Sequence, residues 1–363
     1  MNVLAYIILG FSIIQFLVAL VNLVFSQPFP KSGNNQNPLV SVLIPARNEE
    51  KNIGNILSDL QQNQYKNLEI IVFNDQSEDK TAEIVREFAK ADNRIKLLDS
   101  PFLPDGWLGK NHACYSLAKN ATGKYFLFLD ADVRITGEVI AGAIAFSEKN
   151  QLGLISVFPR QIMKSLGEWI TIPNMNYILL TLLPLILVRK TGIQSLAAAN
   201  GQFMFFDAKI YNQFQPHEKM KSAKVEDILI ARYFKKIKIK IACISAKNAI
   251  ECRMYNGFGE AVNGFSKNVT MFFGNSFLAA ILFWLVTGFG FIAVLVGLPV
   301  FVFYIYLLLL ILTRAAVSVT SGQNAIINIL LIVPQQIALG LFIFKAIENK
   351  FRKRLVWKGR NIS

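Results

Sequence analysis

The chain has 363 residues, of which 53% are hydrophobic and only 17% are charged, whereas soluble domains usually carry about 25% charged residues. Lysine and arginine outnumber aspartate and glutamate by 38 to 24, and the resulting charge of +14 favours anionic partners such as phosphates, lipid head groups or nucleic acid. A simple soluble protein is therefore excluded, and three widely spaced cysteines with two histidines support neither a disulfide framework nor a zinc site.

The first apolar segment covers residues 2–25 and contains no charged side chain. It is long enough to cross ~30 Å of hydrocarbon as a helix, so we predict a transmembrane anchor over residues 1–25. A cleaved signal peptide is the competing interpretation, but no basic segment precedes the apolar stretch, which is longer than the usual length of about 7–15 residues. Residues 26–37 are rich in Pro, Asn and Gly, which predicts a linker.

Between residues 38 and 270 the pattern changes to short apolar runs separated by amphipathic stretches. Such alternation of strand and helix predicts an α/β domain with a doubly wound, mostly parallel sheet covered on both faces. In these sheets ligands bind beyond the carboxyl ends of the strands. The strands are expected at residues 39–44, 68–73, 95–98 and 125–129, and the first helices at 49–62 and 81–89.

The C-terminal region, residues 271–347, is mostly apolar and predicts further transmembrane helices. Residues 276–313 are too long for one span and predict two helices joined near residues 297–299. Pro334-Gln335-Gln336 interrupts a further apolar segment, and a basic tail follows at residues 348–363. An earlier apolar stretch, residues 170–188, contains prolines and asparagines, so we expect it to lie along the membrane surface.

The basic tail and the uncharged first span predict that the central domain and the tail both face the cytoplasm of a multi-pass cell-membrane protein. Three full C-terminal spans would place the tail outside. One segment is therefore interfacial or re-entrant, or the positive-inside rule fails here, and the Pro-Gln-Gln segment is the candidate.

Polar residues follow three of the predicted strands: residues 45–50, residues 74–79, and the pair Asp130 and Asp132. Two carboxylates at a strand end are suited to bind Mg²⁺ or Mn²⁺, and the cation would bridge them to a diphosphate. A lone Asp-x-Asp is weak evidence, but its position directly after a buried strand strengthens it. Helix capping is the alternative role for Asp75 and for Asn48.

Two further stretches carry charged candidates. Glu226 and Asp227 fall in the first turn of a predicted amphipathic helix, where stabilisation of the helix dipole is the alternative explanation. Lys110 lies in a glycine-bounded loop suited to a phosphate, or is an ordinary surface lysine, and His112 is more simply a structural histidine. Lysines alternating with isoleucines over residues 235–240 predict a strand with one solvated face.

Residues 38–270 resemble the family 2 inverting glycosyltransferases of GT-A fold, with a nucleotide-diphospho-sugar-binding domain. The resemblance rests on an ordered series of motifs: VSVLIPARNEEKNI, IIVFNDQSEDKT, GK followed by LFLDAD, ANGQFMFF and VEDILIARYFK. Within the family the chain is most similar to membrane-bound enzymes associated with carotenoid and hopanoid lipids, judged from GWLGKNHA, ECRMYNGFGEAVNGFSKN and WKGR after the last apolar segment.

The resemblance implies a metal-dependent hexosyltransferase that moves a sugar from a nucleotide-diphospho-sugar to a hydroxyl or carboxyl of a membrane lipid or isoprenoid-type acceptor. Asp227 would be the catalytic base and Asp132 would bind Mg²⁺ or Mn²⁺. The implied donor-binding residues are Pro45, Ala46, Arg47, Asn48, Glu49, Asp75, Lys110, Asp130 and Arg253. The residues expected on the acceptor side are Gly201, Gln202, Glu226, Trp357 and Arg360.

The chain departs from the family pattern in two places. Many relatives carry Asp-Asp after the second strand, where this chain has Asn74-Asp75, which leaves the nucleotide open. It also lacks the Gln-x-x-Arg-Trp motif of processive synthases, which disfavours a polysaccharide synthase with a membrane channel. A non-catalytic sugar-nucleotide-binding membrane protein is the other alternative, and no motif predicts nucleic-acid binding.

Overall fold

The computed structural model describes residues 2–27, 37–246, 248–352, 356–357 and 360–361. The chain forms two compact units that interleave along the sequence. The sheet unit contains residues 27–160 and 185–252, and the helical unit contains residues 1–26, 161–184 and 253–363. The domain predicted at residues 38–270 thus contributes to both units, and most of the linker predicted at residues 26–37 lies outside the described residues.

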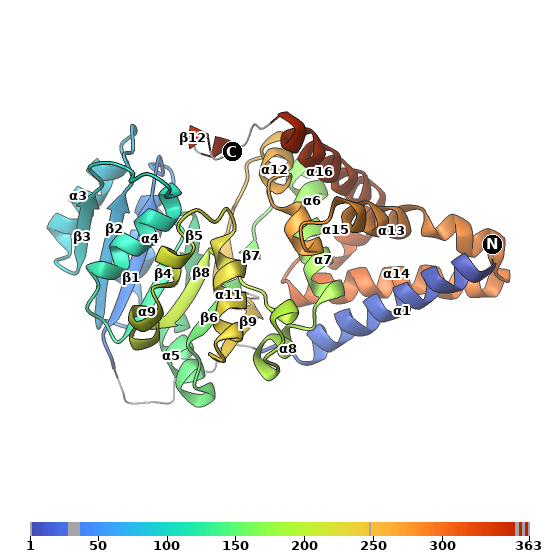
Figure 1. Cartoon of the computed structure of the whole chain (residues 1–363), viewed down its shortest axis with the longest axis horizontal. Coiled ribbons are helices and arrows are strands. Elements are labelled where there is room, and N and C mark those ends of the chain that lie inside the picture. The colour runs from blue at the N-terminus through green and yellow to red at the C-terminus, as the bar shows by residue number, and fades with distance from the viewer. Residues whose placement is uncertain (1, 28–36, 247, 353–355, 358–359, 362–363) are drawn as a thin grey trace. The chain divides into compact units, whose positions relative to one another are not determined.

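Seven strands of the described chain form one mixed sheet in the order β3-β2-β1-β4-β8-β6-β9 (Figure 1). Neighbours are parallel from β3 to β4 and between β6 and β9, whereas β8 is antiparallel to both β4 and β6. The predicted α/β class with a mostly parallel sheet is confirmed. The strands are β1 (Val40–Ala46), β2 (Leu68–Asn74), β3 (Ile95–Asp99), β4 (Tyr125–Leu129), β6 (Leu154–Phe158), β8 (Phe203–Asp207) and β9 (Ile241–Ser245).

The central strands are apolar on both faces because both faces of the sheet are covered. Every residue of β2 and β4 is buried, as expected for strands inside a two-sided α/β layer. Amphipathic helices provide the cover, and α2 buries Ile53, Ile56, Leu57 and Leu60 at helical spacing. The helices of this unit are α2 (Ile53–Gln62), α3 (Thr81–Ala91), α4 (Gly109–Lys119), α5 (Val139–Asn150), α8 (Leu185–Lys190), η1 (Gln194–Leu196), α9 (Ala208–Phe214), α10 (Pro216–Lys219) and α11 (Glu226–Lys236).

A small second sheet lies next to the end of β4. Its strands β5 (Val133–Ile135) and β10 (Ile250–Cys252) pair antiparallel, with Cys252 opposite Val133. The third strand, β7 (Arg160–Gln161), stands where the chain passes from one unit to the other. Because β5 follows Asp132 directly, this pairing fixes the backbone on the far side of the Asp-x-Asp pair.

The strand predicted over residues 235–240 is wrong. Lys235 and Lys236 form the last turn of α11, and β9 begins only at Ile241. The helix is closed by Lys238, whose φ of 63° lies in the left-handed region, and by the N–H of Ile239, which donates to Phe234 O at 2.9 Å. Alternation of Lys and Ile therefore arose from a helix end followed by a turn.

Among its described residues, the helical unit contains three helices long and apolar enough to cross a membrane by length and composition: α1, α13 and α14. The predicted hairpin is confirmed, since α13 ends and α14 begins around Leu298 and Pro299. Within the described residues α16, which contains the Pro-Gln-Gln segment, is not among them. The helices are α1 (Asn2–Val24), α6 (Leu166–Thr171), α7 (Pro173–Leu182), α12 (Phe258–Phe265), η2 (Val269–Phe273), α13 (Phe277–Gly297), α14 (Val300–Thr320), α15 (Ala325–Leu330) and α16 (Ile332–Arg352).

We predicted that residues 170–188 lie along the membrane surface. Most of this stretch forms α7, and most residues of this helix are buried. It packs against α1 and α14, and α1 and α14 run side by side (Figure 1). The polar face of α1 holds it: Asn22 Nδ2 donates to Leu180 O and Leu183 O at 3.0 and 2.9 Å, and Gln15 donates to Thr181. Its depth in a bilayer stays a prediction.

Candidate active site

The loops after β1 and β2 are tied together at the carboxyl edge of the sheet. Arg47 Nη1 donates to the carbonyl oxygens of Asp75 and Gln76 at 2.7 and 3.1 Å, and the N–H of Asp75 donates to Ala46 O. Asn48 adopts a left-handed φ of 53° and accepts the N–H of Glu78. The predicted donor-binding residues at positions 45–49 and 75 therefore lie together, as strand-end placement predicted.

Asn74 has a local role that explains its departure from the family pattern. Its Nδ2 donates to Asp99 Oδ1 at 2.7 Å, and its Oδ1 accepts the N–H of Ser77 at 3.0 Å. An aspartate at this position would face the carboxylate of Asp99 without a donor between them. Asn74 therefore helps to hold the ends of β2 and β3 together in this chain.

At the end of β4, Lys110 lies between two acidic side chains. Its Nζ is 2.7 Å from Asp130 Oδ1 and 3.7 Å from Glu226 Oε1. Burial disfavours the charged amine, but Asp130 and Glu226 outweigh it and raise the pKa of Lys110. Lys110 is therefore a fixed cation of the site, and the surface-lysine interpretation does not apply.

Asp132 carries an oxygen with no partner. Its Oδ1 is buried and accepts no hydrogen bond from the described residues. Burial, followed by the charges of Asp130 and Glu49, raises the pKa of Asp132 to about 7. A buried acceptor among negative charges is costly unless a cation or donor reaches it, so this carboxylate fits the predicted role of metal ligand.

The described residues contain no group of three or more His, Cys, Asp or Glu side chains arranged to hold a metal ion by themselves. An incomplete set of protein ligands is typical of Mg²⁺ sites. Such sites use one or two carboxylates and take their remaining oxygen ligands from water and substrate phosphates. Asp132, with Asp130 two residues away, therefore stays a predicted metal ligand that would need further oxygen ligands from outside the protein.

Asp227 lies in the first turn of α11 and faces Gly201. Asp227 Oδ2 accepts the N–H of Gly201 at 2.9 Å, and Oδ1 accepts the N–H of Ile228 at 2.8 Å. Burial raises the pKa of Asp227. Burial also raises the pKa of the neighbouring Glu226, to about 7. Each carboxylate oxygen retains a second lone pair, so Asp227 is anchored by its helix and remains able to accept a proton.

Gly201 brings the backbone into the middle of this cluster. A Cβ at this position would lie 3.0 Å from Lys110 Nζ, 3.4 Å from Glu226 Oε1 and 3.7 Å from Asp227 Oδ2. The next residue, Gln202, accepts the N–H of Asp130 through its carbonyl oxygen at 3.2 Å. Residues predicted from three separate motifs thus meet within one network.

Cys252 was not predicted from the sequence. Gln202 Nε2 donates to Cys252 Sγ at 2.8 Å, and Cys252 also hydrogen-bonds with Asp132. The thiol connects the predicted acceptor side to the predicted metal ligand. No pattern in the sequence indicates this role of Cys252. The neighbouring Arg253 was predicted to be a functional residue instead.

Three predicted residues are not brought to this network within the sheet unit. Arg253 belongs to the helical unit, where its Nη2 donates to Glu168 Oε1 at 2.9 Å. The backbone of Trp357 and Arg360 forms the paired strands β11 (Val356–Trp357) and β12 (Arg360–Asn361), but their side chains lie outside the described residues. The predicted roles of all three stay predictions. His112, the structural histidine, packs edge-on against Phe73.

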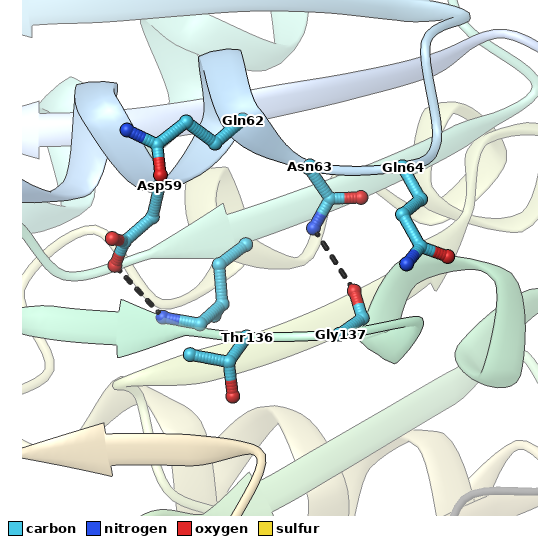
Figure 2. A pocket seen from close by; sticks show the side chains of 7 residues that line it. Asp59, Gln62, Asn63, Gln64, Thr136 and Gly137 are labelled. Atoms are coloured by element: carbon cyan, nitrogen blue, oxygen red, sulfur yellow. Dashed lines mark hydrogen bonds between the residues drawn. The ribbon is translucent and has the colours of Figure 1, made fainter.

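A shallow polar pocket of about 200 Å³ lies elsewhere, between the end of α2 and the residues after β5 (Figure 2). Figure 2 shows Asp59 accepting the N–H of Ile135 and Asn63 donating to Gly137 O. Asp59 also binds Arg134 at 2.6 Å. Because it contains none of the predicted site residues, we do not assign this pocket to the active site.

The chain is similar in sequence and in fold to known glycosyltransferases. Residues 41–214 match the family model described as Glycosyl transferase family 2. The chain is 28% identical over 243 residues to a 4,4'-diaponeurosporenoate glycosyltransferase of Staphylococcus haemolyticus (strain JCSC1435), covering 64% of this chain and 61% of that relative. It is 27% identical over 282 residues to the protein of the same name from Staphylococcus aureus (strain MRSA252), covering 74% and 70%.

Among solved structures, the chain resembles a mannosyltransferase of Pyrobaculum calidifontis that was solved in complex with GDP-Man and Mn²⁺. The TM-score is 0.56 at 16% identity, covering 96% of this chain and 99% of that one. At this identity the likeness concerns the fold alone. It confirms the predicted GT-A fold.

Proposed function

We propose that this chain, whose residues 41–214 match the glycosyl transferase family 2 model, transfers a sugar from a nucleotide-diphospho-sugar to a lipid-type acceptor with inversion at the anomeric carbon. The single observation that carries the proposal is the network of Lys110, Asp130, Glu226 and Asp227 around Gly201. It combines a fixed cation, an anchored carboxylate and a partial metal site at the carboxyl edge of the sheet. This is the set of groups that sugar transfer from a diphosphate requires.

The donor's nucleoside would bind at the loops after β1 and β2, at residues 45–49 and Asp75. Arg47 stiffens this wall by holding two main-chain carbonyls of the second loop. Lys110 would lie against the diphosphate, because it is the cation at the end of β4. Its present partner Asp130 would then be shared between Lys110 and the donor.

Asp132 would hold a divalent cation, Mg²⁺ or Mn²⁺, through the oxygen that has no partner within the described residues. When bound, such a cation stabilises negative charge on diphosphate oxygens. The Pyrobaculum mannosyltransferase was solved with Mn²⁺, which supports a divalent cation in this fold. Cys252 and the small second sheet would keep the carboxylate of Asp132 oriented.

Asp227 would act as the general base. A hydroxyl acceptor is a weak nucleophile at neutral pH, so a carboxylate that takes its proton during attack lowers the barrier. The raised pKa of Asp227 makes it a stronger base than an exposed aspartate. A carboxyl acceptor would already be ionised and would need no general base. In either case one displacement inverts the anomeric centre without a covalent enzyme intermediate.

The acceptor is proposed from the relatives and from the helical unit. The staphylococcal relatives are named for 4,4'-diaponeurosporenoate, whose name denotes a carboxylate, and three helices here are apolar enough to span a bilayer. The chain spans 61% of the length of the S. haemolyticus relative. The relatives' names and the apolar helices both support an acceptor dissolved in the membrane. A multi-pass chain whose sheet unit faces the cytoplasm is part of the same proposal and is motivated by the basic tail.

The test uses the full chain purified in detergent with a panel of nucleotide sugars and an extract of membrane lipids. A lipid that gains the mass of one sugar in the presence of one donor supports the proposal. Asp132→Ala, which should lose metal-dependent donor binding whatever the acceptor, serves as the matched inactive control. Absence of any such lipid across the panel, with donor binding intact, would overturn the transferase assignment.

A further inference from the structure

A chain of polar side chains runs through the interior of the helical unit and begins at Arg314 of α14. Arg314 is only 5% exposed, and it forms no ion pair within the part of the chain that the structure describes. Its guanidinium lies 3.7 Å from the centre of the Tyr177 ring. An arginine buried in an apolar helix bundle without a carboxylate is costly, and such residues usually serve a function.

The hydrogen bonds from Arg314 run in one direction. Arg314 Nη1 donates to Gln335 Oε1 at 2.9 Å. Because a guanidinium can only donate, it fixes which end of the Gln335 amide faces it. Gln335 Nε2 must then donate, and it does so to Asn328 Oδ1 at 3.1 Å and to Trp169 O at 3.0 Å.

The same logic continues to Gln323. Asn328 Nδ2 donates to Ser318 Oγ and to Gln323 Oε1, both at 2.9 Å. Gln323 Nε2 is left as the last donor, and it is buried without a partner within the described residues. Gln323 is 9% exposed. Turning over the Gln323 amide would only set its N–H groups against those of Asn328, so the cluster contains a cation and ends in a donor that is unmet within the described residues.

The cluster lies near one end of a candidate span. Arg314 is six residues before the end of α14 at Thr320, which corresponds to about 9 Å along a helix. Gln323 follows in the turn before α15. If α13 and α14 cross the bilayer as a hairpin, this end of α14 returns to the side on which α13 begins. That is the depth at which lipid head groups meet the hydrocarbon.

We propose that Arg314 and Gln323 form a binding site for the anionic head group of an amphiphile, a carboxylate or a phosphate. Oxygens of either group would accept the charge-assisted bond of the guanidinium. The unmet N–H of Gln323 is a second donor, at the other end of the same hydrogen-bonded cluster. Two sources share this chemistry: an anionic phospholipid of the bilayer, or a lipid acceptor that carries a carboxylate. Naming the acceptor as a source rests on the proposed function, whereas the site itself does not.

The test measures binding to the full chain in neutral detergent, without sugar donor, so that it is independent of transferase activity. The probes are oleate, phosphatidylglycerol and, as the neutral match, oleyl alcohol, each followed by native mass spectrometry. Arg314→Gln is compared with Arg352→Gln, which removes the same charge from an exposed position on α16. We expect at least tenfold weaker binding of oleate or phosphatidylglycerol for Arg314→Gln and wild-type binding for Arg352→Gln.

Gln323→Leu keeps the charge of Arg314 and removes the unmet donor together with the oxygen that accepts from Asn328, so it tests the site if Arg314→Gln does not fold. We expect a three- to tenfold loss. Preference for oleate identifies the carboxylate source and preference for phosphatidylglycerol the phospholipid source, and either supports the site. Equal binding of oleyl alcohol, or unchanged binding by both variants, overturns it. If the wild type binds an anionic probe through Arg314 but transfers no sugar, the proposed function fails while this site stands.

Discussion

The N–H of Gly201 donates to the carboxylate of Asp227 at 2.9 Å, which joins the turn before β8 to the first turn of α11. The same carboxylate accepts the N–H of Ile228. Asp227 is therefore both a structural acceptor and the proposed base. The two roles predict different responses to one substitution, because only the catalytic role depends on accepting a proton.

Asp227→Asn is expected to lower turnover by roughly 10²–10⁴-fold, the usual contribution of acid–base catalysis. Asparagine offers one oxygen where two backbone N–H groups now donate, so the free energy of unfolding should also fall by about 1–3 kcal/mol. Turnover at saturating donor and thermal unfolding, measured together, separate the effects. Glu226→Gln is the control, with a milder loss of turnover. Near-normal turnover of Asp227→Asn would remove it as the base.

Gly201→Ala tests whether the backbone must approach the cluster closely. The added methyl group would lie 3.0 Å from Lys110 Nζ, and this flexible end can shift by a few tenths of an ångström. We expect stability close to that of the wild type and turnover reduced about tenfold, because Lys110 moves relative to Asp130. Gly192→Ala is the matched control, since its methyl group would meet no atom within 4 Å. Equal turnover of the two variants would contradict the prediction.

The strands around the site were predictable because each is a short apolar run ended by polar residues. Tyr125–Leu129 is fully buried and followed at once by Asp130, so its position and its neighbouring carboxylates follow from hydrophobic pattern alone. The sheet's topology then brings the polar ends together. Any chain with this strand order places those residues on one edge.

The strand predicted over residues 235–240 was wrong and the partner of Arg253 was not predicted, because both depend on contacts between residues distant in sequence. Alternation over residues 235–240 does not reveal that Lys235 is buried and bound to carbonyls of another segment. The pairing of Arg253 with Glu168 spans 85 residues and two motifs. Neither partner marks the other in sequence, so Arg253 was placed only by resemblance.

Glu168→Gln should alter the response to acid. Burial alone would raise the pKa of Glu168, but hydrogen bonds from Arg253 and the N–H of Lys164 lower it to about 2, against about 4.3 in an unfolded chain. Its contribution to stability is therefore present above about pH 4.3 and is lost as the pH falls toward 2. Thermal unfolding between pH 6 and 3 should show a smaller loss for Glu168→Gln than for the wild type. Exposed Glu348→Gln is the control and should follow the wild type.

Lys235→Met should alter the response to alkali. Lys235 is 4% exposed and donates to Ile193 O and Leu196 O at 3.2 and 3.0 Å, and burial lowers its pKa to about 8. The folded state therefore binds this proton more weakly than the unfolded chain, whose lysines titrate near 10.4. The resulting destabilisation is complete below about pH 8 and disappears as the pH rises to about 10.4.

The wild type should accordingly gain stability between pH 8 and 10 relative to Lys235→Met, measured by thermal unfolding of the full chain. The neighbouring Lys236 is exposed on the same helix, so Lys236→Met is the matched control and should keep the wild-type slope. Parallel slopes for all three proteins would show that the buried amine does not titrate in this range.

Asp132→Ala tests the partial metal site. The substitution removes the oxygen that has no partner within the described residues, together with a buried negative charge, so the fold should be retained or slightly stabilised. Metal-dependent donor binding should be lost, because Asp130 alone, already bound to Lys110, cannot hold the cation with the diphosphate.

Isothermal titration of a panel of nucleoside diphosphates, with Mn²⁺ or Mg²⁺ and again with chelator, measures this loss directly. Cys252→Ser is the companion variant: it keeps a donor toward Asp132 and should preserve the metal effect. Wild-type affinity of Asp132→Ala in the presence of metal, or equal wild-type affinity with and without chelator, would contradict the assignment of Asp132 as the metal ligand.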